Sequence, residues 1–183
     1  MSSIAEHIQK QLDNGRYDDG LFLEYCHDGN LEGVKYLVET LGVDINAPGG
    51  IGNVCLTGQM HIFDYFLSKG VNMMPEPECL GGFTTLICAV MRSQFPLALR
   101  LLPLITPEYI NQSDSSGQTA VHNAVRMNSL YMLKHLVSYG ADLNKKDKRG
   151  KTPIMIAEEE GFLDIVDYIK DHFKKKTLLI KYT

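Results

Sequence analysis

The chain has 183 residues, of which 44% are hydrophobic and 22% charged, a composition that supports one folded domain and excludes an intrinsically disordered chain. Its 18 Lys and Arg residues against 22 Asp and Glu residues give a formal net charge of -4, which argues against nucleic acid or an anionic membrane as its partner. The N-terminus lacks the apolar stretch of a signal peptide, and Arg100 and Pro103 interrupt the most apolar segment, so no membrane-embedded segment is expected.

The first fifteen residues predict a short amphipathic helix. Ile4, Ile8 and Leu12 recur at four-residue intervals, which places their side chains on one face of a helix. Gly15 provides the stop signal, because glycine readily adopts the left-handed conformation that ends helices. The apolar face of this helix is expected to pack against the residues that follow.

Residues 19–46 predict two helices followed by a turn. Apolar residues recur with helical spacing from Tyr25 to Val38, and Gly29 divides this stretch into a first and a second helix. The sequence Gly-Val-Asp-Ile-Asn at residues 42–46 then ends the second helix.

Residues 47–78 show the second half of this pattern more clearly than the first half. Residues 58–67 predict a second helix, which ends at Gly70. Before it, four of the seven residues at positions 47–53 are glycine or proline, and both residue types weaken helices. The first helix of this segment is therefore expected to be short or irregular.

Residues 79–113 contain a third copy of the pattern between two irregular stretches. Residues 84–89 predict its first helix. The preceding connection, residues 73–82, holds two prolines and two glycines and is expected to be an extended, projecting loop, which is either a partner-specific surface or a tolerated divergence. Pro103 should end the second helix early, since proline disfavours helix at the residue before it.

Residues 114–176 contain the two clearest copies, which are separated by 33 positions. Residues 117–124 align with residues 150–157, and the apolar residues of the following helices also match. In the last copy, Thr152 should cap the first helix through its hydroxyl group, and Pro153 should occupy the first helical position, where no N–H donor is needed.

The interval of 33 residues, together with the pattern Thr-Pro-Leu-His-x-Ala that residues 119–124 and 152–157 follow in part, resembles the ankyrin repeat. The resemblance extends over residues 19–173. It implies an all-α solenoid of stacked helix-turn-helix units with short hairpin loops, in which neighbouring repeats stabilise one another. A single domain of residues 1–183 is expected, made of an N-terminal capping helix, five repeats of which the first two are degenerate, and a tail: 1–18, 19–46, 47–78, 79–113, 114–146, 147–176 and 177–183.

Ankyrin-like arrays bind partners with their hairpin tips and the solvent-facing side of their first helices, so the resemblance implies a concave binding surface. His122 occupies the position of the family's turn histidine, which implies hydrogen bonding between hairpins and not catalysis. The residues that the resemblance places on the binding surface are Phe83, Met91, Arg92, Ser115, Ser116, Gln118, Arg126, Met127, Lys148, Arg149 and Lys151.

The charge distribution allows two interpretations. Residues 145–151 carry five positive charges and one negative charge, whereas Glu76 and Glu78 make the loop at residues 73–82 acidic. This gradient would orient an acidic segment of a partner, or else the basic run is a solvated loop, as short charge runs usually are.

Catalytic and metal-binding motifs are missing from the sequence. It contains no glycine-rich phosphate loop, no Gly-x-Ser-x-Gly and no His-Glu-x-x-His, so we expect no enzyme activity, no cofactor and no bound metal. Cys26, Cys55, Cys79 and Cys88 lie far apart without ligand spacing. Buried, reduced thiols are favoured over a zinc site or a disulfide, which indicates a cytoplasmic or nuclear protein.

The sequence therefore predicts a protein-protein interaction module, a scaffold, adaptor or inhibitor, which is monomeric and binds a protein but neither nucleic acid nor a membrane. The alternative is a regulatory subunit whose irregular repeats two and three dock onto a catalytic protein. Asn144 lies in a context that resembles that of ankyrin asparagines hydroxylated by a dioxygenase, although a role as a turn residue of its own hairpin is the simpler interpretation.

Overall fold

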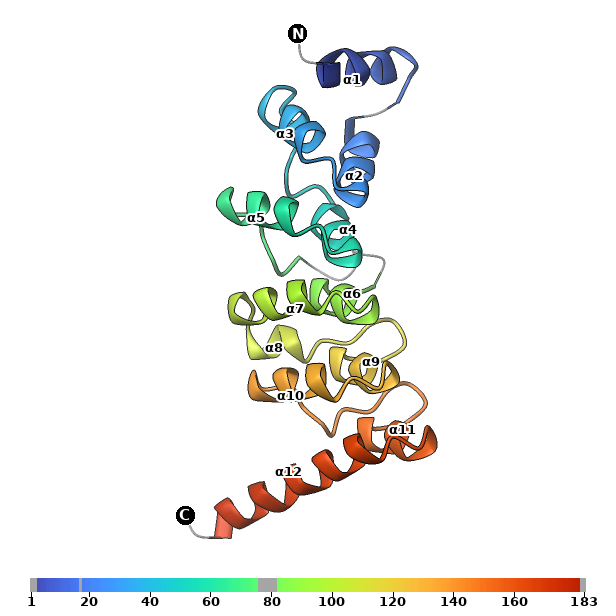
Figure 1. Ribbon diagram of the computed structural model, residues 1–183, viewed down its shortest axis with the longest axis vertical. Helices are drawn as coiled ribbons and strands as arrows, with labels where there is room; N and C mark the ends of the chain where they lie inside the picture. The colour runs from blue at the N-terminus through green and yellow to red at the C-terminus, as the bar shows by residue number, and fades with distance from the viewer. Residues whose placement is uncertain (1–2, 17, 76–81, 182–183) are drawn as a thin grey trace. The chain divides into compact units, whose positions relative to one another are not determined.

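The computed structural model describes residues 3–16, 18–75 and 82–181, and these residues form twelve α-helices and no β-strand (Figure 1). The chain divides into two compact units, an N-terminal unit of residues 1–104 and a C-terminal unit of residues 105–183. The predicted all-α class and its succession of helix-turn-helix units are confirmed in each unit.

In the N-terminal unit, a single helix precedes three helix pairs. The single helix packs on α3 and buries Ala5 and Ile8, and Gly15 follows it with a φ of +81°, so the predicted N-terminal amphipathic helix is confirmed. The helices of this unit are α1 (Ser3–Asp13), α2 (Asp18–Asp28), α3 (Leu31–Glu39), α4 (Gly50–Thr57), α5 (Met60–Ser68), α6 (Thr85–Met91) and α7 (Phe95–Leu101).

The first helices of the three pairs form one continuous stack. Helix α4 packs against α2 on one side and against α6 on the other, while α3 also contacts α5. Between the pairs, the fully buried rings of Phe22 and Phe66 stack with their centroids 6.1 Å apart and their planes 13° from parallel. The core of this unit therefore continues from one pair to the next, as expected for repeats that cannot bury their apolar faces alone.

The prediction that the first helix of residues 47–78 is short or irregular is wrong. Helix α4 begins at Gly50 and has eight residues, one more than α6 has. Gly50 is buried against Phe22, and a Cβ atom at this position would lie 2.7 Å from Phe22 Cε1. The glycine allows the close packing of α4 on α2, and that packing compensates for the low helix propensity of the segment.

The two irregular stretches around the third copy have different outcomes. Most of the predicted loop, residues 76–81, lies outside the described residues. At its described beginning, Met73 is buried and its carbonyl oxygen accepts a hydrogen bond from Thr85 Oγ1 at 2.9 Å. Helix α7 ends at Leu101 and a 3₁₀ turn containing Pro103 follows, which confirms the predicted early end.

In the C-terminal unit, a four-residue helix precedes two helix pairs. Helices α9 and α11 pack on each other, and Ala124 and Ala157 are fully buried on them, so the predicted close approach of the first helices is confirmed. The last helix continues beyond residue 176, the predicted end of the final repeat. The helices are α8 (Pro107–Ile110), α9 (Ala120–Arg126), α10 (Leu130–Ser138), α11 (Pro153–Glu159) and α12 (Leu163–Lys181).

The threonines that precede the first helices do not all act as caps. Thr84 Oγ1 accepts the backbone N–H of Ile87 at 3.1 Å, as an N-cap residue should. Pro153 begins α11 as predicted, but the hydroxyl group of Thr152 is buried without a hydrogen-bond partner, so the predicted cap at this position is wrong.

Three of the four cysteines are described, and all three are buried free thiols, as predicted. Burial raises the pKa of Cys26 and Cys88 to about 12 and that of Cys55 well above its usual value, so the thiol form persists at neutral pH. Cys79 lies outside the described residues. None of the described helices combines the length and apolar character needed to cross a bilayer.

Candidate functional site

The hairpin tip at residues 147–151 is held in shape by its first residue. One carboxylate oxygen of Asp147, Oδ1, accepts the backbone N–H groups of Arg149 and Lys151, each at 2.9 Å. The N–H of Asp147 donates to the carbonyl oxygen of Lys151 at 2.9 Å, and Gly150 turns the chain with a φ of +78°. The backbone of this tip is therefore fixed by its own five residues.

The preceding tip, residues 114–118, has the same construction. Asp114 Oδ1 accepts the N–H groups of Ser116 and Gln118 at 2.8 and 2.9 Å. The two tips are also joined directly, because the N–H of Lys148 donates to the carbonyl oxygen of Ser116 at 2.9 Å. A single hydrogen-bonded surface thus spans both tips.

The side chain of His122 links helix α9 to the second tip. His122 is fully buried, and its Nδ1 accepts the backbone N–H of Thr119 at 3.2 Å, which places the ring proton on Nε2. Nε2 then donates to the carbonyl oxygen of Lys151 at 3.2 Å. Hydrogen bonding of this histidine to the neighbouring hairpin, which the family resemblance implies, is confirmed.

The buried imidazole of His122 should make the stability of the C-terminal unit depend on pH. Burial lowers the pKa of His122 below 6.5, so below about pH 6.5 the unfolded chain binds a proton that the folded chain resists. The free energy of unfolding should therefore fall as the pH decreases from about 7.5 to about 5, and the His122→Gln variant should show a weaker dependence. Urea unfolding at several pH values tests this expectation. It would be contradicted if the free energy of unfolding had the same dependence on pH in the parent and in the variant.

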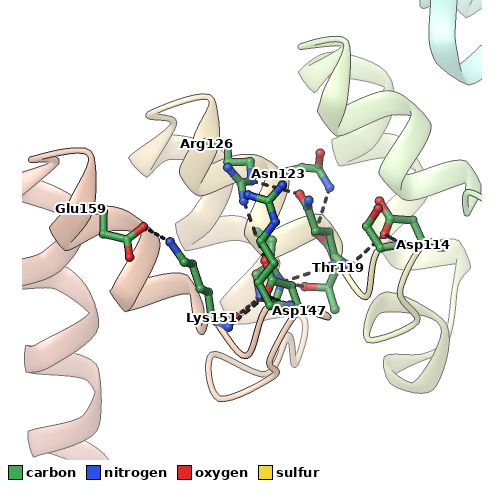
Figure 2. A network of polar contacts seen from close by, with 11 residues as sticks. Asp114, Thr119, Asn123, Arg126, Asp147, Lys151 and Glu159 are labelled. Atoms are coloured by element: carbon green, nitrogen blue, oxygen red, sulfur yellow. Dashed lines mark hydrogen bonds and ion pairs between the residues drawn. The ribbon is translucent and has the colours of Figure 1, made fainter.

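Arg126 lies beside the buried carboxylate of Asp147 (Figure 2). Its Nε donates to Gln118 Oε1 at 3.1 Å, and one of its terminal nitrogens lies 3.9 Å from Asp147 Oδ2. Burial pushes the pKa of Asp147 up, but the N–H groups of Lys151 and Arg149 and the charges nearby outweigh burial and lower it. Asp147 therefore stays ionised at neutral pH.

The surface of the second tip is left strongly positive. Four cations on this tip and just before it, called the tip cations, are exposed and form no ion pair with any residue in the described part of the chain: Lys145, Lys146, Lys148 and Arg149. The acidic residue among them, Asp147, has a side chain only 2% exposed and turned toward the protein. By contrast, Lys151 pairs with Glu159. The local negative charges are thus engaged inside the structure, and the tip cations are available to a partner.

The predicted binding residues fall into two groups. Ser115, Ser116, Gln118, Arg126, Met127, Lys148, Arg149 and Lys151 belong to the two tips and the end of α9 in the C-terminal unit. Met127 is 44% exposed at the end of α9. Phe83 and Met91, both half-buried, and the exposed Arg92 lie in the N-terminal unit instead. The participation of both groups in binding stays a prediction.

Residues that shape this surface were missed in the sequence. Asp114 and Asp147 build the tips, and Asn123 Nδ2 donates to the carbonyl oxygen of Thr119 at 3.1 Å. A signal for the aspartates exists, because each stands three positions before the glycine of its tip. Among the residues described, no group of three or more His, Cys, Asp or Glu side chains is arranged to hold a metal ion.

Comparison with protein families finds ankyrin repeats. The family described as ankyrin repeats (three copies) matches residues 98–179. This range includes both tips and the helices of the two clearest copies, except for the last two residues of α12. The helix pairs α2–α3 and α4–α5, outside the match, show the same succession of two helices and a turn.

Three relatives illustrate the range of similar proteins. Protein phosphatase 1 regulatory subunit 27 of Homo sapiens is 44% identical over 54 residues, 30% of this chain and 35% of that protein. NF-kappa-B inhibitor alpha of Gallus gallus is 30% identical over 100 residues, 54% of this chain and 31% of that protein. Alpha-latrocrustotoxin-Lt1a of Latrodectus tredecimguttatus is 29% identical over 156 residues, 79% of this chain and 11% of that protein. The chain thus spans about a third or less of the length of each of these relatives.

Proposed function

Because this chain is an ankyrin-repeat protein, we propose that it binds a partner protein through the two hairpin tips and the exposed end of α9 in the C-terminal unit. The observation that carries this proposal is the set of four tip cations without ion pairs, beside an aspartate whose charge is held inside the protein. A surface of this charge favours an acidic segment of the partner and speeds its association.

The rigid construction of the tips supports the same function. Both tips are fixed by hydrogen bonds from backbone N–H groups to the side chains of Asp114 and Asp147. His122, on α9, also donates a hydrogen bond to the carbonyl oxygen of Lys151 in the second tip. A partner that binds such a surface loses little free energy to ordering the loops. Arg126 and Met127 provide a cation and an exposed apolar side chain next to the tips, the combination that contact hot spots often contain.

In this proposal the chain acts as an adaptor, scaffold or inhibitor, as a monomer in the cytoplasm or nucleus, and performs no catalysis. Two relatives, a phosphatase regulatory subunit and an inhibitor, favour a second candidate function. In that alternative, the chain regulates a catalytic protein that docks onto the segments at residues 47–78 and 79–113, where Phe83, Met91 and Arg92 lie.

Charge reversal at the second tip tests the proposal. The double variant Lys148→Glu, Arg149→Glu should lose at least about tenfold in affinity for the partner recovered by affinity purification, because two exposed attractive charges become repulsive. Binding by the parent should also weaken as salt is added. The matched control, Lys10→Glu with Lys134→Glu, makes the same change in net charge at exposed positions that do not belong to the tips.

The two variants separate the candidate functions. Equal loss of binding in both would indicate a nonspecific effect of net charge and would contradict a site at the tips. Unchanged binding in both, with loss on Phe83→Ala and Arg92→Ala, would favour docking through the segments at residues 47–78 and 79–113.

A further inference from the structure

Asparagine side chains join the turns that follow successive second helices. In the N-terminal unit, Asn46 Oδ1 accepts the backbone N–H of Asn72 at 3.0 Å. In the C-terminal unit, Asn111 Oδ1 accepts the N–H of Asp142 at 2.7 Å, and its Nδ2 donates to the carbonyl oxygen of Gly140 at 2.9 Å. Each asparagine therefore binds the backbone of the next turn.

The turns that these asparagines bind have a common sequence. Residues 70–72 read Gly-Val-Asn and residues 140–142 read Gly-Ala-Asp, so each turn has a glycine, a small apolar residue and an aspartate or asparagine. The N–H of the third residue is the donor in both cases. At the second turn, the carbonyl oxygen of Gly140, the first residue, is also used.

Asn144 stands at the same place in its turn as Asn46 does. In both turns, the aspartate two positions earlier accepts the asparagine N–H at its Oδ1, at 2.9 Å for Asp44 and 2.8 Å for Asp142. Yet the side-chain amide of Asn144 is exposed and forms no hydrogen bond with any residue in the described ranges. The reason is that α12 remains helical where a further turn would follow.

A groove lies where that further turn would be. It has a volume of about 430 Å³, and its walls combine apolar side chains with the exposed Lys175. At Asn46, where the turn at residues 70–72 is in place, only about 50 Å³ remains. The residues that line the larger groove are Val137, Gly140, Ala141, Asp142, Leu143, Asn144, His172, Phe173 and Lys175.

We propose that this groove binds a segment of a partner protein that has the sequence glycine, small apolar residue, aspartate and adopts the turn conformation of residues 140–142. A glycine at the first position can adopt the left-handed conformation of Gly140, whose φ is +93°, so its carbonyl group and the N–H two residues later can bond the amide of Asn144 as Gly140 and Asp142 bond Asn111. The small apolar side chain contacts the apolar wall, and Lys175, which has no ion pair with a described residue, attracts the aspartate.

A peptide with the sequence of residues 138–144, Ser-Tyr-Gly-Ala-Asp-Leu-Asn, reproduces the turn that Asn111 holds and is the appropriate probe. Its addition to the isotope-labelled chain should move the side-chain NH₂ signals of Asn144 and the signals of Leu143 and Phe173 in NMR spectra. The control peptide has N-methylaspartate in place of its aspartate, which keeps the carboxylate but removes the N–H that Asn144 Oδ1 would accept. The affinity of the control peptide should be at least about tenfold lower than that of the first peptide.

The Asn144→Ala variant should lose about tenfold in affinity for the first peptide, since two hydrogen bonds are removed at an exposed position without loss of packing. The Asn14→Ala variant, also exposed but far along the chain from the groove, should bind the peptide as the parent does. Equal binding of the two peptides, or unchanged binding by Asn144→Ala, would overturn the proposal. So would failure of the peptide to bind together with self-association in sedimentation experiments, which would identify a second copy of the chain as the occupant.

Discussion

The Ala124→Asp substitution is expected to lower the free energy of unfolding by about 3–5 kcal/mol, the largest effect anticipated for a single change. Ala124 is fully buried on α9, which packs against α11. A carboxylate at this position would lose its hydration without gaining a partner, and it would also separate the two helices. Urea unfolding followed by circular dichroism measures the effect.

The control for this substitution is Met127→Asp, which adds the same charge at the end of the same helix. Met127 is 44% exposed, so its replacement should change the free energy of unfolding by less than about 0.5 kcal/mol. A similar loss in both variants would show that the added charge itself destabilises the unit. A small loss at Ala124 would contradict the view that the first helices stack closely.

The Gly117→Ala substitution should destabilise the C-terminal unit by about 2–4 kcal/mol, because it combines backbone strain with a steric clash. Gly117 has a φ of +76°, and a Cβ atom there would lie 2.8 Å from the backbone nitrogen of Lys148. That nitrogen donates to the carbonyl oxygen of Ser116, so the clash occurs at the bond that joins the two tips.

Gly150 is a matched control for the effect of the clash. Its φ of +78° is nearly the same as that of Gly117, but nothing lies within 4 Å of a Cβ atom built on it. Gly150→Ala should therefore cost only the strain of a left-handed residue, about 1–2 kcal/mol. Hydrogen exchange at the N–H of Lys148 should accelerate in Gly117→Ala alone. Equal stability and equal exchange in the two variants would argue against a joined pair of tips.

Much of the fold could be predicted from the sequence because its signals are local or periodic. The spacing of Ile4, Ile8 and Leu12 predicts α1, and Pro103 predicts the end of α7, the second helix of the third copy. The 33-residue interval identifies α9 and α11 as equivalent helices. The failures arose where a contact distant in sequence decides the outcome. Gly50, the first residue of α4, lies against Phe22, a contact that no local sequence pattern records.

The site could be predicted only in part for the same reason. Positions on the tips followed from alignment to the repeat, but the sequence does not show which charges remain free. Asp147 appears as one negative charge among five positive ones, whereas the structure turns it inward toward the N–H groups of Arg149 and Lys151. The unsatisfied hydroxyl group of Thr152 likewise depends on surroundings that no local pattern records.

Photo-crosslinking tests most directly whether the hairpin tips bind the partner. A photoreactive amino acid placed at exposed Ser115, on the first tip, should cross-link to the partner recovered from cell extract. The same amino acid at Tyr131, which is 56% exposed on α10, should give little or no cross-link. Cross-links from Tyr131 to that partner, with none from Ser115, would contradict the account.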